Sequence, residues 1–488
     1  MTHVIPDPRF ANIQSLAPDS FEEVHGRIGK SMERAIQMLR DQGLAEDVAA
    51  LLCVDPLRAE SAFRDELYRL GCTVLSAAFE HVDSDTPSSL EIAGTSYRRM
   101  DASPGHALTL FGPITFNRAR YRPTSGQGAC FVPAEARLEL TASGFTPAAA
   151  CLSMALMSSL TARESADIWG RFCGAGPATS TLVRLSATAG QCLESCSQDV
   201  LEELRAQEDV SAEAVTLHAS IDGVMLRMNA ETAGEDVIEA AGWREASCGV
   251  VSLLDGDGNR LWSRYFGRLP EEGKHSLKAQ LSNEVFHWLA REPDLKLVVS
   301  ADGAKDNWRF SESLKPDVEV LDFWHATGYL KLAADAAFGS DEEASTKWYE
   351  DKRHVLRHDP KGVGKVIDAL RHLLRKGEGR TEIERALGYV RNNRRRMNYY
   401  HIAKAGYPIG SGEVEAANKV LVTQRLKRSG QSWGRDGGQG VLAYRALLKS
   451  DRFDRAWRML VPRMSRSRQD WKPLNQIAND NRELNIAA

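Results

Sequence analysis

Between residues 215 and 322 the chain alternates short apolar runs with polar turns, in an order that few folds can accommodate. The expected elements are, in chain order, a strand at 217–226, hairpin strands at 248–254 and 260–266, a helix at 277–291, and strands at 296–300 and 318–322. This order predicts a mixed sheet with helices on its faces, an α/β fold. From residue 326 to 400 the apolar spacing is helical throughout, which predicts an all-α segment after the last strand.

Three acidic residues occupy positions from which such a sheet presents side chains to a cleft. Asp222 lies in the first strand, and Asp302 directly follows the strand at 296–300. Glu415 lies in a later helix that begins near residue 411. Three clustered carboxylates repel one another unless cations neutralise them. They can hold two Mg²⁺ (or Mn²⁺) ions, which serve phosphodiester chemistry by activating an attacking oxygen and stabilising a leaving oxygen. Asp-Gly is also a common turn dipeptide, so both aspartates could instead shape turns.

Two glutamates compete for the third position. Ser411 is placed to cap the helix, and an acid in its first turn, such as Glu413, is favoured by the helix dipole alone. Glu415 lies further in, beside Ala416 and Ala417, which leave room for a close approach. We therefore expect Glu415 to be the buried, metal-directed carboxylate.

The distribution of charge favours a polyanionic partner. The whole chain has a formal net charge of −4, but residues 353–435 hold 19 Lys and Arg against 7 Asp and Glu. That segment therefore carries +12 and the remainder −16. A local basic block can bind phosphates whatever the pI of the whole chain. The alternative is a solvated helical face with internal salt bridges.

The cysteines and the apolar runs bear on the cellular setting. None of the eight cysteines has C-x-x-C spacing, so we expect reduced, mostly buried thiols rather than disulfides. The first eight residues are not typical of a signal peptide, and no apolar run reaches membrane-spanning length. These features predict a cytoplasmic, nucleoid-associated protein without membrane contacts.

Two segments resemble a known family. The run Tyr407–Lys419 is similar to the hallmark motif of DDE transposases from bacterial insertion sequences of the ISKra group, and the run Gln424–Trp433 is similar too. The resemblance extends from about residue 111 to 458. It implies kinship with Mutator-like elements and an RNase H-like core interrupted by a helical insertion. It also implies that Asp222, Asp302 and Glu415 are the catalytic and metal-binding residues.

The resemblance implies further site residues. Asp322 and His325 match a D-x-x-H element and would be auxiliary, although an Asp–His pair that fixes the strand-to-helix turn is an equal alternative. Trp433 could stack on an unpaired base, although tryptophans more often fill cores. The candidate DNA-binding residues are Arg394, Arg395, Arg396, Lys419, Arg425, Lys427, Arg428 and Trp433.

The expected organisation follows from these patterns. The regions are an N-terminal helical region (1–93), a small β region (94–140), a helical region (141–205), the first part of an RNase H-like core (206–325), an α-helical insertion (326–404) and a C-terminal region with the helix of Glu415 (405–488). The β region should contain a hairpin with its turn at Gly112-Pro113. Segments 161–170 and 178–187 permit a DNA-reading helix-turn-helix, but any αα-hairpin would look similar. Relatives often carry a zinc ribbon in the β region; only Cys130 remains here, so we expect no structural zinc.

The sequence thus predicts a transposase that cleaves and joins DNA with two metal ions. Its partners would be transposon-end DNA and target DNA, bound by a homodimer or larger assembly. A metal-dependent nuclease without joining activity and a non-catalytic DNA-binding descendant of a transposase are the alternatives. A glycosidase is poorly supported, because the acids lack nearby aromatic sugar platforms.

Overall fold

The computed structural model describes residues 21–82, 87–92, 95–233, 236–376 and 379–465. The chain divides into two compact units, each described here by itself. The first unit comprises residues 1–153, 162–185 and 461–487, and the second comprises residues 154–161, 186–460 and 488. The expected boundary at residue 205 is not where the units divide, because helices α5 (Pro147–Ser159) and α7 (Thr179–Ser195) each contribute to both.

The first unit combines long helices with two small sheets. Its elements are α1 (Phe21–Asp41), α2 (Leu44–Val54), α3 (Pro56–Val82), β1 (Ser89–Ile92), β2 (Thr95–Arg99), β3 (Ser103–Thr109), β4 (Gly112–Arg118), β5 (Tyr121–Pro123), α4 (Pro133–Arg137) and α6 (Ala162–Phe172). The expected N-terminal helical region (1–93) extends too far, because residues 89–92 form β1, which pairs with β2. The expected hairpin turn is also misplaced. Thr109 closes the turn by accepting a hydrogen bond from Phe111 N, so Gly112 and Pro113 begin β4 instead.

The second unit is built on a five-stranded mixed sheet, which confirms the α/β fold class. Its elements up to the last strand are α8 (Ser197–Ala206), β6 (Thr216–Met228), β7 (Glu231–Ala233), β8 (Asp236–Glu239), β9 (Gly242–Leu254), β10 (Arg260–Arg268), η2 (Glu272–Lys274), α9 (His275–Arg291), β11 (Lys296–Ala301), α10 (Lys305–Leu314) and β12 (Val318–Leu321). The strand order is β10-β9-β6-β11-β12. Strands β6, β11 and β12 are parallel, whereas β9 is antiparallel to both β6 and β10.

Alternation along β6 assigns its two faces. Leu217, Ala219 and Ile221 join the apolar core that α9 covers. His218 and Asp222 therefore point to the opposite face, where they contact the segment after residue 410. The face that carries Asp222 is thus the face away from α9.

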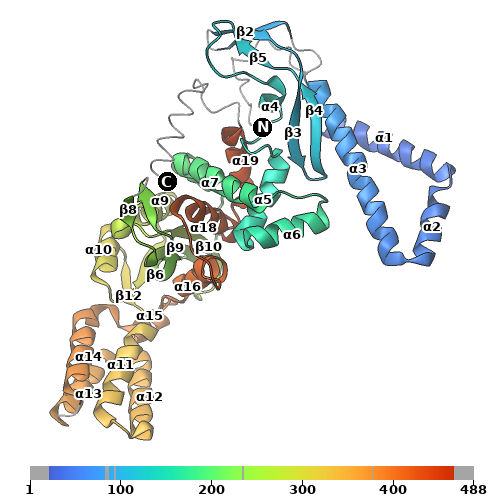
Figure 1. Cartoon of the computed structure of the whole chain (residues 1–488). Coiled ribbons are helices and arrows are strands. Elements are labelled where there is room, and N and C mark those ends of the chain that lie inside the picture. The colour runs from blue at the N-terminus through green and yellow to red at the C-terminus, as the bar shows by residue number, and fades with distance from the viewer. Residues whose placement is uncertain (1–20, 83–86, 93–94, 234–235, 377–378, 466–488) are drawn as a thin grey trace. The chain divides into compact units, whose positions relative to one another are not determined.

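A helical bundle follows the last strand, as expected. Its elements are α11 (Phe323–Phe338), α12 (Glu342–His358), α13 (Gly362–Lys376), α14 (Arg380–Asn393), η3 (Arg394–Arg396) and α15 (Tyr399–Lys404). Figure 1 shows α11 to α14 packed side by side at the β12 edge of the sheet. Val298 and Val320 of the sheet share one apolar core with Leu330, Leu370 and Val390 of the bundle, so the bundle is anchored to the two strands nearest it.

The chain then returns to the sheet. The last elements are α16 (Gly412–Ala417), the π-helix η4 (Asn418–Thr423), α17 (Gln424–Leu426), α18 (Arg435–Lys449) and α19 (Phe453–Met464). Isolated π-turns inside helices are rare and are frequent at functional sites. In the residues that the structure describes, no helix has the length and apolarity needed to cross a membrane. The eight cysteines, all within the described residues, form no disulfide. Only Cys248 is fully buried and Cys53 is exposed, so the expectation of mostly buried thiols is wrong.

Candidate active site

Asp222 and Asp302 are brought together by strand register. The parallel pairing of β6 with β11 ends at the pair Ile221–Ala301. Asp222 and Asp302 are the next residue of each chain segment, so both leave the paired sheet at the same edge. β6 itself does not end at Asp222 but continues with β9 as a two-stranded arm to Met228. Only the part of β6 that β11 covers ends there.

Each aspartate is held by a side-chain amide and a backbone amide. The half-buried Asp222 accepts hydrogen bonds from Gly223 N (2.7 Å) and from Asn418 Nδ2 (2.6 Å). Asp302 Oδ1 accepts from Ala304 N (3.1 Å) and from Asn307 Nδ2 (2.7 Å). Both carboxylates are therefore oriented, and neither is neutralised by the group that holds it.

Glu415 approaches the aspartates from α16. Asn418, which binds Asp222, lies three residues after Glu415, and residues three apart share one face of a helix. The expectation that Glu415 is buried is wrong, since its side chain is exposed. Exposure suits a group that must meet a ligand from solvent.

The pKa of Asp222 reflects its burial first and the other two carboxylates second. Burial raises the pKa of Asp222, and the charges of Asp302 and Glu415 raise it further. The hydrogen bond from Gly223 and the charge of Lys274 act in the opposite direction without cancelling the rise. The site thus holds more negative charge than its own cations compensate.

The donor atoms fit a hard divalent cation, although they are not assembled around one. In the described part of the chain, no three His, Cys, Asp or Glu side chains are grouped closely enough to hold a metal ion. Carboxylate and amide oxygens are nevertheless the ligands that Mg²⁺ prefers. The buried amide oxygens of Asn418 and Asn307 also have no hydrogen-bond partner among the described residues. Each belongs to an amide that holds one of the aspartates, so unused oxygen donors lie beside both.

Asp322 links the last strand to the helix of Glu415. It is 1% exposed and caps α11 by accepting a hydrogen bond from the backbone N of His325 (2.6 Å). Its other oxygen accepts from Ser411 N (2.6 Å) and Ser411 Oγ (2.8 Å). The expectation that Ser411 caps its own helix is therefore wrong, because its hydroxyl is used by Asp322.

His325 does not pair with Asp322 through its ring. Its exposed imidazole lies beside two tyrosine rings, Tyr329 at 6.2 Å and Tyr389 at 6.5 Å between centroids. Those tyrosines stack at 3.8 Å, and Tyr389 packs against Gly303 in the turn after Asp302. The structure thus favours the fixing of the turn by Asp322 and leaves the role of His325 a prediction.

The candidate DNA-binding residues fall into two groups. Arg394, Arg395, Lys419 and Lys427 are exposed, and Arg428 is half-buried. The other three have partners within the protein that leave Arg425 buried and Arg396 and Trp433 half-buried, which argues against their assignment as DNA contacts. They are Arg396, which pairs with Glu319 (2.7 Å) and lies over Trp308; Arg425, which is 1% exposed and donates to Met157 O; and Trp433, whose indole N–H donates to Leu426 O.

Lys274 is a site residue that the sequence analysis missed. Its charge lowers the pKa of Asp222, and its ammonium pairs with Glu245 at 2.7 Å. Its backbone is left-handed, with φ of +55°, immediately before α9. A Cβ on Gly223 would collide with the Glu245 carboxylate, so that glycine makes room for the pair. Lys274 lies in the turn between β10 and α9 and belongs to no sequence motif that would identify it as a site residue.

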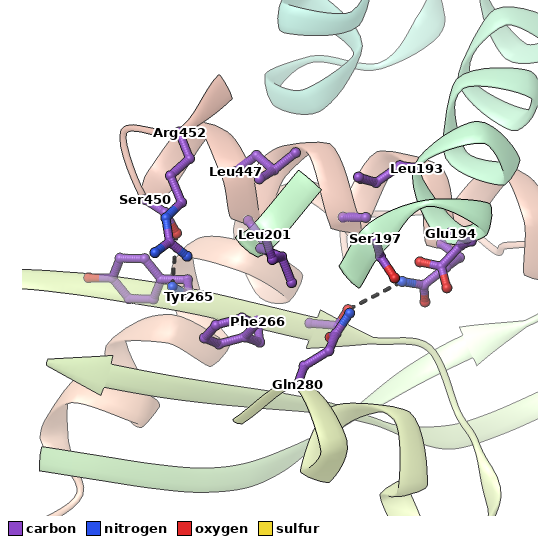
Figure 2. A pocket seen from close by; sticks show the side chains of 14 residues that line it. Leu193, Glu194, Ser197, Leu201, Tyr265, Phe266, Gln280, Leu447, Ser450 and Arg452 are labelled. Atoms are coloured by element: carbon purple, nitrogen blue, oxygen red, sulfur yellow. Dashed lines mark hydrogen bonds between the residues drawn. The ribbon is translucent and has the colours of Figure 1, made fainter. Parts of the chain in front are cut away.

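A cavity lies elsewhere in the second unit. Figure 2 shows it above β10, between α8, α9 and α18, with Arg452 and Ser450 on one side and Glu194 on the other. Ser450 Oγ accepts a hydrogen bond from Tyr265 N at 2.9 Å. None of the three carboxylates lines this cavity.

Comparisons with known proteins add little. No protein-family model matches the chain, and no curated protein matches it. Among solved structures the chain is similar to a chain of the Drosophila P element transposase strand transfer complex, with 14% identity and a TM-score of 0.25, over 71% of this chain and 86% of that one. A TM-score this low means that the two chains do not superpose as one arrangement, and the likeness carries no weight for function.

Proposed function

We propose that this protein is a DNA transposase that cleaves and joins DNA by a metal-dependent DDE mechanism. The observation that carries the proposal is that Asp222 and Asp302 both directly follow the last pair of β6 with β11, and that the charges of Asp302 and Glu415, together with burial, raise the pKa of Asp222. The strand order supports it as well. In the sheet β6, β11 and β12 are parallel, and β9 lies antiparallel beside β6. This is the RNase H-like arrangement that the resemblance implies.

The residues present would hold two Mg²⁺ ions through Asp222, Asp302 and Glu415. When bound, Mg²⁺ supplies an activated oxygen nucleophile and neutralises charge on the leaving oxygen. Asn418 and Asn307 orient the two aspartates, and Asp322 fixes the start of the helix that brings Glu415 to them. The chain thus supplies a fixed, uncompensated negative cluster, and no protein nucleophile is required.

The DNA would be held by exposed cations on two segments of the second unit. Lys419 lies on η4 and Lys427 directly follows α17, so both come after Glu415 along the chain. Arg394 and Arg395 lie on the helical insertion. Neutralising phosphates with such side chains makes binding sensitive to salt. A homodimer or larger assembly would be needed to hold two DNA ends.

The test uses the full chain with DNA taken from both flanks of its gene. We expect Mg²⁺-dependent nicking at the element ends and joining of a pre-cleaved end to a target plasmid. Asp302→Asn should abolish both activities. The matched control is Asp306→Asn, which also removes a carboxylate charge nearby, but one already paired with Lys278 at 2.6 Å. Cleavage without joining would support the nuclease alternative, and Asp302→Asn protein with full activity would overturn the mechanism.

A further inference from the structure

A second polar group lies buried beneath the three carboxylates. His218 is 0% exposed, and both of its ring nitrogens are used. Nδ1 lies 3.0 Å from Glu413 Oε2, and Nε2 lies 2.7 Å from Ser300 Oγ. We call Ser300, His218 and Glu413 the buried triad. The imidazole thus links the Glu413 carboxylate to the Ser300 hydroxyl through its two ring nitrogens.

Each member of the buried triad lies within four residues of one carboxylate. His218 lies four residues before Asp222 on β6, so both point to the same face of the strand. Ser300 lies in β11, two residues before Asp302, which directly follows the end of that strand. The triad therefore spans the same two segments as the aspartates, one layer deeper in the protein.

The third pair differs because it lies on a helix. Residues two apart point to different sides of a helix, so Glu413 faces the sheet while Glu415 faces out. The Glu413 side chain is only 22% exposed. The 3.0 Å contact from Glu413 Oε2 to His218 Nδ1 thus ties α16 to β6.

We propose that the buried triad is the positioning layer of the active site: it fixes the spacing between β6, β11 and α16, and through it the separation of Asp222, Asp302 and Glu415. This inference rests on the proposed function. Its members touch neither DNA nor metal and act through the carboxylates. A positioning role predicts that disturbing the triad weakens metal binding more than it weakens the fold, because such outer residues change metal affinity by roughly 10–100-fold.

The test compares two buried serines that each make one hydrogen bond of the same length. Ser300 is 0% exposed and bonds His218 at 2.7 Å, and Ser311 is 0% exposed and bonds Glu319 at 2.7 Å. Binding of Mn²⁺ to the full-length protein is measured by calorimetry, and Tm by circular dichroism, for Ser300→Ala and Ser311→Ala. We expect similar falls in Tm, with a Kd for Mn²⁺ raised about tenfold by Ser300→Ala alone.

A second variant separates position from charge. Glu413→Gln keeps a side-chain oxygen that can accept from His218, whereas Glu413→Ala removes it, so affinity for Mn²⁺ should fall further in Glu413→Ala. Unchanged Mn²⁺ affinity in both Ser300→Ala and Glu413→Ala, with lowered Tm, would show that the triad is only structural and overturn the inference. Wild-type protein that binds no Mn²⁺ would overturn the proposed function and the inference with it.

Discussion

Two carboxylate clusters in the second unit have opposite electrostatic characters. In the first, Glu208 and Glu284 are buried with arginines, and Arg452 Nη2 lies 2.7 Å from both. Burial opposes ionisation of Glu284, but the charges of Arg452 and Arg205 outweigh it and lower its pKa to about 2. In the second, burial and the neighbouring acids raise the pKa of Asp222.

The difference distinguishes acids that have cationic partners inside the fold from the acids that we propose to bind metal. Glu208 and Glu284 have arginine partners within the fold, so an external cation would gain nothing there. Asp222 and Asp302 are held by amides, which orient a carboxylate without neutralising it. Perturbed pKa values alone would have marked both clusters. The direction of the shift distinguishes them.

The largest effect is expected from a change in the cluster of Asp222, Asp302 and Glu415. Asp302→Asn should lower the rate of DNA cleavage by about 1,000-fold, because several kcal/mol of charge stabilisation are lost. Its Tm without metal should not fall, since one of the repelling charges is removed. Single-turnover cleavage and thermal unfolding measure the two quantities. A variant that unfolds at lower temperature and still cleaves would reverse the assignment of the clusters.

The next largest effect is expected from a change in the cluster of Glu208, Glu284 and Arg452. Arg452→Ala should lower the free energy of unfolding by roughly 3–5 kcal/mol, because it leaves two buried carboxylates without their shared partner. Denaturant unfolding measures this change. Arg455→Ala is the control: that side chain also reaches Glu208 at 2.7 Å but is 31% exposed, so its loss should cost much less.

Acid titration sharpens the comparison, because the two clusters respond in opposite directions. The folded pKa of Glu284 is depressed, so its contribution to stability is present above its ordinary pKa of 4.5 and is lost as pH falls from 4.5 towards 2. The loss should be on the order of 3 kcal/mol. The folded pKa of Asp222 is raised, so its contribution favours the fold below its ordinary 3.8 and is lost as pH rises through the folded pKa. Unfolding free energies against pH for wild type, Glu284→Gln and Asp222→Asn measure both slopes; identical curves for wild type and Asp222→Asn would contradict the second.

The smallest effect concerns the exposed cations of the insertion. Replacing Arg394 and Arg395 together by Ala should reduce the slope of log DNA affinity against log salt by about 1 for each phosphate that is no longer neutralised. Stability should not change, since both side chains are exposed. Arg396→Ala serves as the matched control. It should lower Tm, because Arg396 pairs with Glu319, and leave the salt slope unchanged. Filter binding across a salt series measures the slopes.

Much of the second unit could be predicted from the sequence because its strands are continuous apolar runs. The strand of Asp222, the hairpin 248–266 and the helix before Asp302 are all confirmed. The spacing of apolar residues indicates which face of a segment is buried and whether it is a helix or a strand. In these segments it predicted the type of element correctly. Unit boundaries that cut through helices, such as α7, leave no mark in the apolar spacing.

The candidate site was only partly visible in the sequence for a related reason. The spacing of acids indicated which residues to consider, but the side to which each points depends on tertiary contacts. Glu415 is exposed because Glu413 takes the place facing the sheet, through a partner 195 residues away. Arg425 and Arg396 looked like DNA contacts because charge is visible in a sequence, whereas their internal partners are not. Lys274 was missed because a lone lysine in a turn has no distinguishing pattern.

The π-helix after α16 makes segment length matter as much as residue identity. The bond from Gln424 N to Lys419 O spans five residues, so this stretch holds more chain per turn than the α-helical ends it joins. It lets Asn418 face Asp222 while Arg425 faces the interior. Deleting one residue there would leave an unbroken helix but swing its amino-terminal end by about 100° around the axis. The Glu415 carboxylate would then be present but would no longer point towards Asp222 and Asp302.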